Sequence, residues 1–182
     1  MNGMFQRCYV FNQDIGNWDV SSVTQMVVTF DSAYQFNQDI SGWNTAAVTT
    51  MYAMFQNAAS FDTAIPTNNT NNWNVSNVAS MHSMFLGTEF NQDLSTWDVS
   101  SVTNMAYMFN RCAEFNQNIS GWDVNQVTDF TNFLAYNTDL STANYNLLLH
   151  HWEADDPLDS KAFHGGDATT DSSSGGVDGT AA

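Results

Sequence analysis

Apolar side chains recur along the chain at intervals of three and four residues, separated by short polar stretches. In one segment Val23, Met26, Phe30 and Ala33 follow each other at intervals of three, four and three. This spacing places side chains on one face of a helix, so it predicts a short helix with Ser21 as its N-cap. The polar residues that follow suit a turn and then a short strand.

The same pattern recurs through most of the chain. Repeats of about 25 residues start at Met1, Met26, Met51, Met81 and Met105, and a degenerate one starts at Phe130. Their consensus is M-x-x-M-F-x-x-C/A-x-x-F-N-Q-D-I-S-x-W-D-V-S-x-V-T-x. One such repeat cannot bury its own apolar residues, whereas stacked repeats share a continuous core. We therefore predict an α/β repeat fold, a right-handed solenoid of five to six rungs. Each rung would hold a short helix and one or two short parallel strands, and a C-terminal helix would cap the array.

The domain limits follow from where this pattern stops. We predict a repeat solenoid over 1–139 with an outward insertion at 66–72, and a C-terminal cap over 140–164. An amphipathic helix over Tyr145–Trp152 is expected within the cap. The last segment, 165–182, contains Gly, Ser, Thr and Asp without large apolar residues, so it is predicted to be a disordered tail.

The repeat register also predicts which side chains are buried. Tryptophans that share one repeat position should be buried in a row along the coil: Trp18, Trp43, Trp97 and Trp122. Cys8 and Cys112 share another position. We expect both to be small core residues, too far apart in the stack for a disulfide.

The first repeat has no capping segment ahead of it. Solenoids need covered ends for solubility. An apolar edge is therefore expected at Met4, Phe5, Phe11 and Ile15, together with unpaired backbone groups. Two hypotheses follow: the chain is a piece of a longer protein, or this rung meets a partner.

The repeat resembles the BspA-like family of surface proteins, which is related to the leucine-rich repeats. The resemblance rests on Met105-x-x-Met108-Phe109-x-x-Cys112, on Phe115-Asn116-Gln117 and on Trp122-Asp123-Val124, and it covers residues 1 to about 164. The segment Leu140 to Trp152, followed by Phe163-His-Gly-Gly166, is similar to the element that closes such arrays. The resemblance implies an extracellular or cell-surface protein used for adhesion or other protein contacts.

Charge narrows the range of partners. The chain carries 19 acidic residues against three basic ones, a net charge of −16, in 182 residues of which 43% are hydrophobic. Binding of nucleic-acid phosphates or of an anionic membrane needs clustered Lys or Arg, so we expect neither a nucleic acid nor a membrane as partner. No apolar run is long enough to span a bilayer, and no signal peptide starts at Met1.

Two rows of acidic residues are the only candidates for a metal site. Asp14, Asp39 and Asp93 share one repeat position, and Asp19, Asp98 and Asp123 share another. Calcium between rungs is one interpretation, because it prefers hard oxygen ligands. The other interpretation, which we favour, is that these side chains accept turn N–H groups. Asn replaces Asp in both rows, and Asn closes turns equally well without supplying charge.

Other polar residues receive structural interpretations. Asn12, Asn37, Asn91 and Asn116, with Asp62 in repeat three, form a row expected to bond open backbone groups of neighbouring rungs. His82 is expected on an exposed helix face, and His150 and His151 point to different faces of one helix. Asn68, in the insertion, is the sequon most accessible for glycosylation.

No constellation of catalytic residues stands out from the repeat, so an enzyme is not expected, and neither is a cofactor. The first functional hypothesis is a non-catalytic adhesion or protein-interaction module that docks a protein or surface-glycan partner. Its outward residues would be Tyr9, Tyr34, Tyr52 and Tyr107. The alternative is a structural subunit that self-associates through its open N-terminal rung, as a homo-oligomer in a filament or surface layer. A glycan-active protein is a third hypothesis, supported only by analogy with other solenoids and by the Trp and Asp content.

Overall fold

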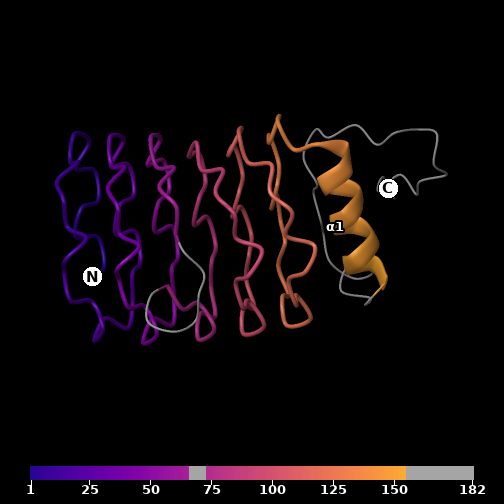
Figure 1. The fold of residues 1–182 in the computed structure, drawn as a ribbon, viewed down its shortest axis with the longest axis horizontal. Helices are drawn as coiled ribbons and strands as arrows, with labels where there is room; N and C mark the ends of the chain where they lie inside the picture. The colour runs from indigo at the N-terminus through magenta and orange to yellow at the C-terminus, as the bar shows by residue number, and fades with distance from the viewer. Residues whose placement is uncertain (66–72, 155–182) are drawn as a thin grey trace.

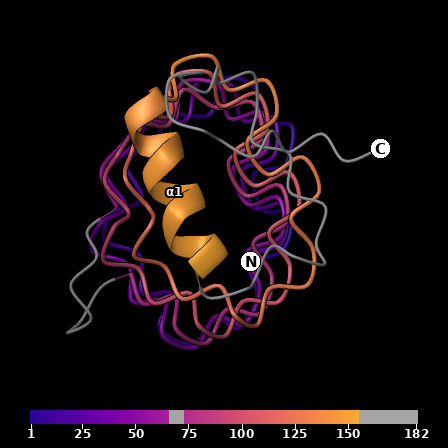
Figure 2. The same ribbon diagram turned by 90° about the vertical axis from the view of Figure 1, so that its right-hand side faces the viewer.

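The chain winds into a stack of similar coils that is closed at one end by a helix (Figure 1). The computed structural model describes residues 1–65 and 73–154, so the insertion at 66–72 and the residues from 155 onward lie outside it. The coils begin where the sequence repeats begin. Viewed along the stack, they superpose as one ring, and the helix lies across its end (Figure 2). We call residues 1–25 the first coil.

The predicted fold class is wrong, because the coils contain neither helices nor extended strands. In the described ranges the only helix is α1, Thr142–Ala154. Strand pairing is reduced to isolated parallel bridges between consecutive coils: Gln25 with Thr50, Thr50 with Ser80, Ser80 with Asn104, and Asn104 with Asp129. The predicted α/β solenoid, with a short helix and one or two short parallel strands in each of five to six rungs, is thereby replaced by a stack of coils built from turns.

Consecutive β-turns occupy the segment that the apolar spacing assigns to a helix. In the first coil the N–H groups of Met4, Gln6 and Cys8 each donate to the carbonyl three residues earlier, at 3.1–3.4 Å. The N–H groups of the residues in between point out of the coil toward the next one. Those of Gly3 and Phe5 donate to carbonyls of the next coil at 2.9 Å. Every second N–H group therefore links neighbouring coils, an arrangement that an α-helix could not provide because it satisfies its N–H groups internally.

Left-handed backbone angles explain why the segment does not continue as a helix. The third and seventh residues of the first coil, Gly3 and Arg7, have φ of 60° and 58°. In the next coil the equivalent Val28 and Ser32 have φ of 47° and 59°. A right-handed helix cannot pass through such residues. Without a helix, Ser21 is not an N-cap, and its N–H group instead donates to Asp19 Oδ1 at 3.0 Å.

Gly87 provides a test of this backbone. It has φ of 68°, and a Cβ atom there would lie 2.8 Å from Asn57 Oδ1. We expect Gly87→Ala to lower the free energy of unfolding by about 1–2 kcal/mol, the usual cost of a left-handed residue with a Cβ. Gly121→Ala is the matched control, because a Cβ atom there meets nothing within 4 Å. Equal stability of the two variants in urea unfolding would contradict the assigned angles.

The core consists of two parallel rows of phenylalanine rings flanked by tryptophans. Within a coil the two rings stack closely, as Phe30 and Phe36 do at 4.0 Å between centroids. Between coils the rows continue, as from Phe30 to Phe55 at 5.5 Å. Predicted burial is confirmed for three of the four tryptophans, at 0–4% exposure: Trp43, Trp97 and Trp122. It is wrong for Trp18, which is 43% exposed because no described coil covers it.

The indole N–H groups of three tryptophans tie neighbouring coils together. Those of Trp43, Trp73 and Trp122 each donate to a carbonyl of the preceding coil, at 2.8–3.0 Å. The equivalent group of Trp97 is buried and has no partner within the described residues. By analogy its acceptor would be the carbonyl of Ile65, the last residue before the insertion. The indole bond to the preceding coil is therefore missing where its acceptor would lie next to the insertion.

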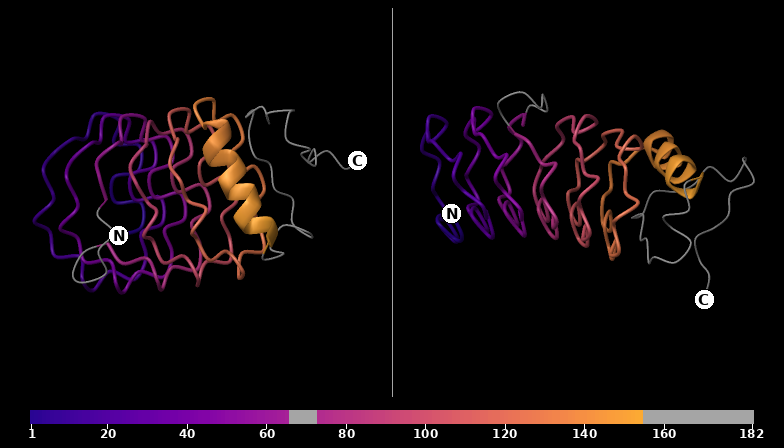
Figure 3. Two further views of the ribbon diagram at one scale, coloured as in Figure 1. Left: turned by 45° about the vertical axis from the view of Figure 1, so that its right-hand side comes forward. Right: turned by 90° about the horizontal axis from the view of Figure 1, so that it is seen from below.

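Helix α1 closes the C-terminal end of the stack, opposite the N-terminus (Figure 3). It begins after Ser141, whose Oγ accepts the N–H group of Asn144 at 3.2 Å, as an N-cap does. The helix expected over Tyr145–Trp152 is thus present. Its Trp152 ring packs on Phe130 at 5.3 Å between centroids and is 2% exposed. The predicted tail at 165–182 and the end of the predicted cap lie outside the described residues.

Candidate functional site

The acidic rows close turns. In the first row each aspartate accepts, through Oδ1, the N–H group of the residue two positions later in the chain. The distances are 2.8–3.0 Å for Asp14, Asp39 and Asp93. The second row repeats this bond at 3.0–3.1 Å, with Asp19, Asp98 and Asp123 as acceptors. Hydrogen bonds from the hydroxyl and backbone N–H of Ser21 hold the pKa of Asp19 below its usual value, as those of Ser41 do for the pKa of Asp39. These contacts are what the structural interpretation requires.

Asparagine closes the same turns without a charge. The amide oxygen of Asn44 accepts from Ala46, and that of Asn118 accepts from Ser120, both at 3.1 Å. Across the described part of the chain, no three His, Cys, Asp or Glu side chains converge as metal ligands would. The hydrogen bonds of both rows are thus those that the turn-closing interpretation predicts.

Removal of divalent cations tests this assignment. We expect the melting temperature to be the same in EDTA as in millimolar calcium, because each carboxylate already has its donor within its own turn. A bound ion would stabilise the fold in proportion to the logarithm of its concentration. A melting temperature that falls by several degrees in EDTA and recovers with calcium would overturn the assignment.

The asparagine row forms a hydrogen-bonded ladder along the stack, as predicted. The side-chain oxygen of each member accepts the backbone N–H group of its equivalent in the next coil, at 2.8–3.0 Å, from Asn12 through Asn37, Asp62 and Asn91 to Asn116. Asn116 ends the row by accepting the N–H group of Ser141 at 2.9 Å. The ladder thus connects the coils to the start of α1.

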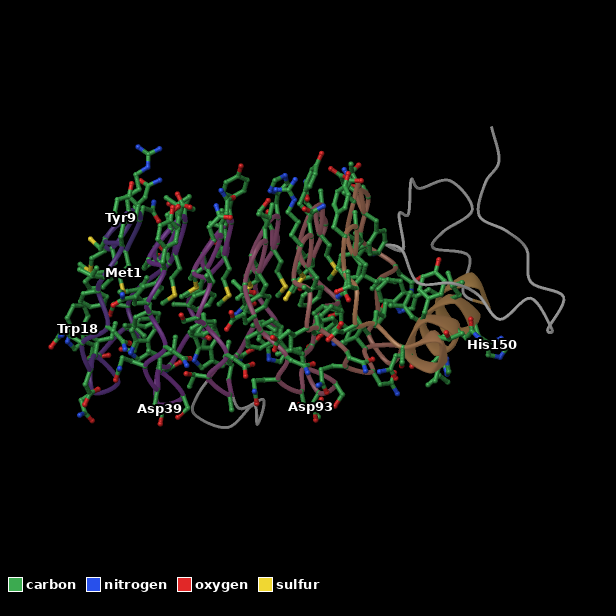
Figure 4. The ribbon with its side chains drawn as sticks, turned by 90° about the horizontal axis from the view of Figure 1, so that it is seen from above. Met1, Tyr9, Trp18, Asp39, Asp93 and His150 are labelled. Carbon is green, nitrogen blue, oxygen red and sulfur yellow. The ribbon has the colours of Figure 1, made fainter. Side chains whose placement is uncertain are left out.

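Two groups of aromatic side chains lie on the outside of the coils; Tyr9, Tyr34 and Tyr52 are exposed in them, and His82 and Tyr107 are half-buried. Tyr9 and Tyr34 stack at 5.1 Å between ring centroids, and they are 50% and 48% exposed. Tyr52 stacks on His82 at 4.8 Å, and His82 contacts Tyr107 at 5.5 Å. We call these the Tyr9 pair and the His82 group. Tyr9 lies on the edge of the stack opposite Asp39 and Asp93 (Figure 4).

Two contacts of aromatic side chains on the outside of the coils are not evident from the sequence. His82 lies between the two tyrosines and is partly buried, so its predicted exposure on a helix is wrong. Arg111 lies over the ring of Tyr136 at 5.5 Å, a cation–π contact that no motif indicates. The only available signal is that Tyr52 and His82 share one position of the repeat.

The surroundings of His82 make its protonation unfavourable. Burial lowers its pKa below the ordinary value of 6.5, although the charge of Asp129 acts in the opposite direction. Its Nδ1 atom lies 2.9 Å from Ser83 Oγ. Because the folded state prefers the neutral ring, stability is complete above pH 6.5 and is lost as the pH falls from there toward the folded pKa.

A pH series tests this environment. Between about pH 7 and about pH 5 we expect a small loss of stability in the wild type and a smaller one in His82→Gln. The aspartates with lowered pKa lose their contribution only below their usual value of 3.8, so they do not act in this window. His150→Gln, at an exposed position of α1, is the control. The same slope in wild type and His82→Gln would show that His82 titrates freely.

The two cysteines differ in environment. Cys112 is buried as predicted and donates to the carbonyl of Phe90 at 3.2 Å, and burial raises its pKa to about 12. Cys8 is exposed, so its predicted burial is wrong. It belongs to the first coil, whose outer side no described coil covers. Both thiols are free.

The remaining candidate residues do not converge. His150 and His151 are both exposed on α1, with their rings edge to face at 5.8 Å. Asn68 lies outside the described residues. Among the residues that the structure describes, no helix combines the length and apolar character needed to cross a bilayer.

Stacked coils joined by side-chain ladders and closed by a helix define a repeat protein. The family described as "Mycoplasma protein of unknown function, DUF285" matches residues 1–72 and again 63–168, and the chain belongs to this family. No curated protein and no solved structure matches the chain.

Proposed function

We propose that the protein is a non-catalytic adhesion or interaction module of a cell-surface or secreted protein, and that the Tyr9 pair and the His82 group contact its partner. The observation that carries this proposal is the ordering of exposed aromatic rings by stacking: Tyr34 is held by Tyr9, and Tyr52 by His82. A ring that is already fixed loses little conformational entropy on binding, and tyrosine is enriched where proteins bind one another.

Charge indicates the kind of partner. With a net charge of −16, the protein repels other acidic surfaces and attracts basic ones. The described turns also place no acid, base and nucleophile together, so the proposal assigns no reaction. Surface or secreted localisation rests on the resemblance to BspA-like repeats.

Binding to a panel of immobilised extracellular glycoproteins and to intact cells tests the proposal. We expect wild type to bind at least one protein target, and Tyr34→Ser with Tyr52→Ser to weaken that binding by about tenfold or more. Leu147→Ser is the control, because Leu147 is a similarly exposed apolar residue on α1. Equal binding by both variants would exclude the aromatic groups as the contact. Binding lost on deglycosylation of the target would favour a glycan partner instead.

A further inference from the structure

The His82 group has a carboxylate beside it. Tyr52, His82 and Tyr107 come from three consecutive coils, and their rings follow one another at 4.8 and 5.5 Å between centroids. Asp129 is bridged to Asn104, three residues before Tyr107. The charge of Asp129 also acts on the pKa of His82, so the two side chains lie near each other. Aromatic rings and an anionic group therefore share one part of the outer surface, where Asp129 is half-buried.

Asp129 keeps its charge at neutral pH and can accept a further donor. The N–H group of Thr131 donates to its Oδ1 atom at 3.0 Å, and this bond holds the pKa of the carboxyl below its usual value. Its Oδ2 atom accepts from the side chain of Asn104 at a long 3.4 Å. A carboxylate can accept about four hydrogen bonds, so acceptor sites remain. Because burial lowers the pKa of His82, that ring is neutral at pH 7 and does not neutralise the carboxylate.

The coils already form one contact of the kind that such a surface offers. The guanidinium of Arg111 lies over the ring of Tyr136, 5.5 Å from its centroid. The two residues occupy the same repeat position in neighbouring coils. Arginine suits aromatic faces and carboxylates better than lysine does, because its planar group stacks on rings and presents a fork of donors. An arginine that reached the His82 group would meet both kinds of partner at once.

We propose that the His82 group and Asp129 bind an arginine side chain of the protein's partner. The guanidinium would lie against an aromatic ring of the group and donate to the open acceptor sites of Asp129. This site rests on the function proposed above, and it specifies the partner as a protein with an exposed arginine in a basic segment. The net charge of −16 attracts any basic segment, whereas the rings and the carboxylate together select arginine.

Calorimetric titration of the full chain with synthetic peptides tests the site. The probes are a Gly/Ser peptide that carries several arginines, its lysine counterpart and its citrulline counterpart. At physiological salt, which screens the net charge, we expect the arginine peptide to bind about threefold or more tightly than the lysine peptide. The citrulline peptide should not bind measurably, because it keeps the shape of arginine without the charge.

Asp129→Asn separates the charge from the fold. Asn104 holds the same repeat position one coil earlier, and its Oδ1 atom accepts the N–H group two residues later at 3.0 Å, so an amide closes this turn as well. We expect Asp129→Asn to raise the dissociation constant of the arginine peptide by about threefold or more. Asp93→Asn is the matched control, because it also removes one charge and Asn118 closes the equivalent turn one coil later. It should leave the affinity unchanged, and melting temperatures near that of wild type will show that both variants fold.

Tyr107→Leu tests the aromatic part of the site. It should weaken the arginine peptide by a similar factor and leave the lysine peptide unchanged, because leucine keeps an apolar side chain without the ring face. Equal affinities of the arginine and lysine peptides would overturn the arginine site. So would equal weakening by Asp129→Asn and Asp93→Asn, or no binding of the arginine peptide at millimolar concentration.

The outcome is distinguishable from that of the proposed function. If the arginine peptide fails but Tyr34→Ser with Tyr52→Ser still abolishes binding to a target of the panel, the interaction module stands and the arginine site is wrong. If the arginine peptide binds as expected and the panel contains no target, the site is supported and the adhesion module is not.

Discussion

Phe55→Ala should lower the free energy of unfolding by about 3–5 kcal/mol, the usual cost of removing a large aromatic side chain from a packed core. Phe55 is fully buried near the middle of the stack. Its ring stacks on Phe61 at 3.9 Å and continues the row to Phe30 and Phe85 at 5.5 and 5.8 Å. The truncation leaves a cavity that touches three coils. Because each coil contacts only its neighbours, side chains from other parts of the molecule cannot fill this cavity.

Tyr52→Ala is the matched control, because Tyr52 belongs to the same coil but is 42% exposed. It should cost about 1 kcal/mol or less, mainly from the stacking with His82. Urea unfolding followed by tryptophan fluorescence and by circular dichroism measures both variants. If the two substitutions cost the same, or if Phe55→Ala unfolds as wild type does, the continuous aromatic core is wrong.

The sequence predicts which residues lie in the same row but not the backbone that carries them. Burial of Met26 and Phe30 follows correctly from the repeat, because side-chain polarity alone separates inside from outside. The predicted helix fails because consecutive turns also return apolar side chains to one side every three or four residues. Left-handed angles at Val28 and Tyr107 cannot be inferred from their residue types, which ordinarily avoid that region. The residue types that do indicate it are the glycines at Gly3 and Gly87 and, more weakly, the asparagines at Asn57 and Asn132.

Prediction from repeat position fails at the first coil. Cys8 and Trp18 have buried equivalents, Cys112 and Trp43, but burial at these positions is provided by the preceding coil. The predicted apolar edge is present at Met4 and partly at Phe5 and Phe11, whereas Ile15 is 3% exposed. Residue type therefore indicates which surface of a coil is apolar, and the position of the coil in the stack decides whether another coil covers that surface.

The candidate site was predictable only in part. Tyr9, Tyr34, Tyr52 and Tyr107 are recognisable as outward residues because the core positions are already filled by Phe, Met and Trp. Their division into two groups was not predictable. Tyr52 and Tyr107 meet through His82, and that contact depends on how far neighbouring coils are displaced from one another.

The asparagine ladder was predictable because its residues repeat at a position where only a hydrogen-bond acceptor is required. Asn116 is its last member, and its Oδ1 atom accepts from the Ser141 backbone and from the Asn144 side chain, both at 2.9 Å. Asn116→Ala removes both bonds and leaves the N–H group of Ser141 without an acceptor, at the residue that caps α1. We expect a loss of about 1–3 kcal/mol in the free energy of unfolding, the usual cost of leaving a buried or half-buried donor unpaired.

Asn116→Asp separates the hydrogen bonds from the residue type. A carboxylate keeps the acceptor oxygen, and Asp62 already occupies the same position in the third coil, where it accepts the N–H group of Asn91 at 2.8 Å. We therefore expect Asn116→Asp to unfold within about 0.5 kcal/mol of wild type in urea. Trp152, on α1, should change its fluorescence at lower urea than the remaining tryptophans in Asn116→Ala, because the damage lies at the junction of stack and helix. If Asn116→Asp is as damaging as Asn116→Ala, the acceptor oxygen is not what joins the coils to α1.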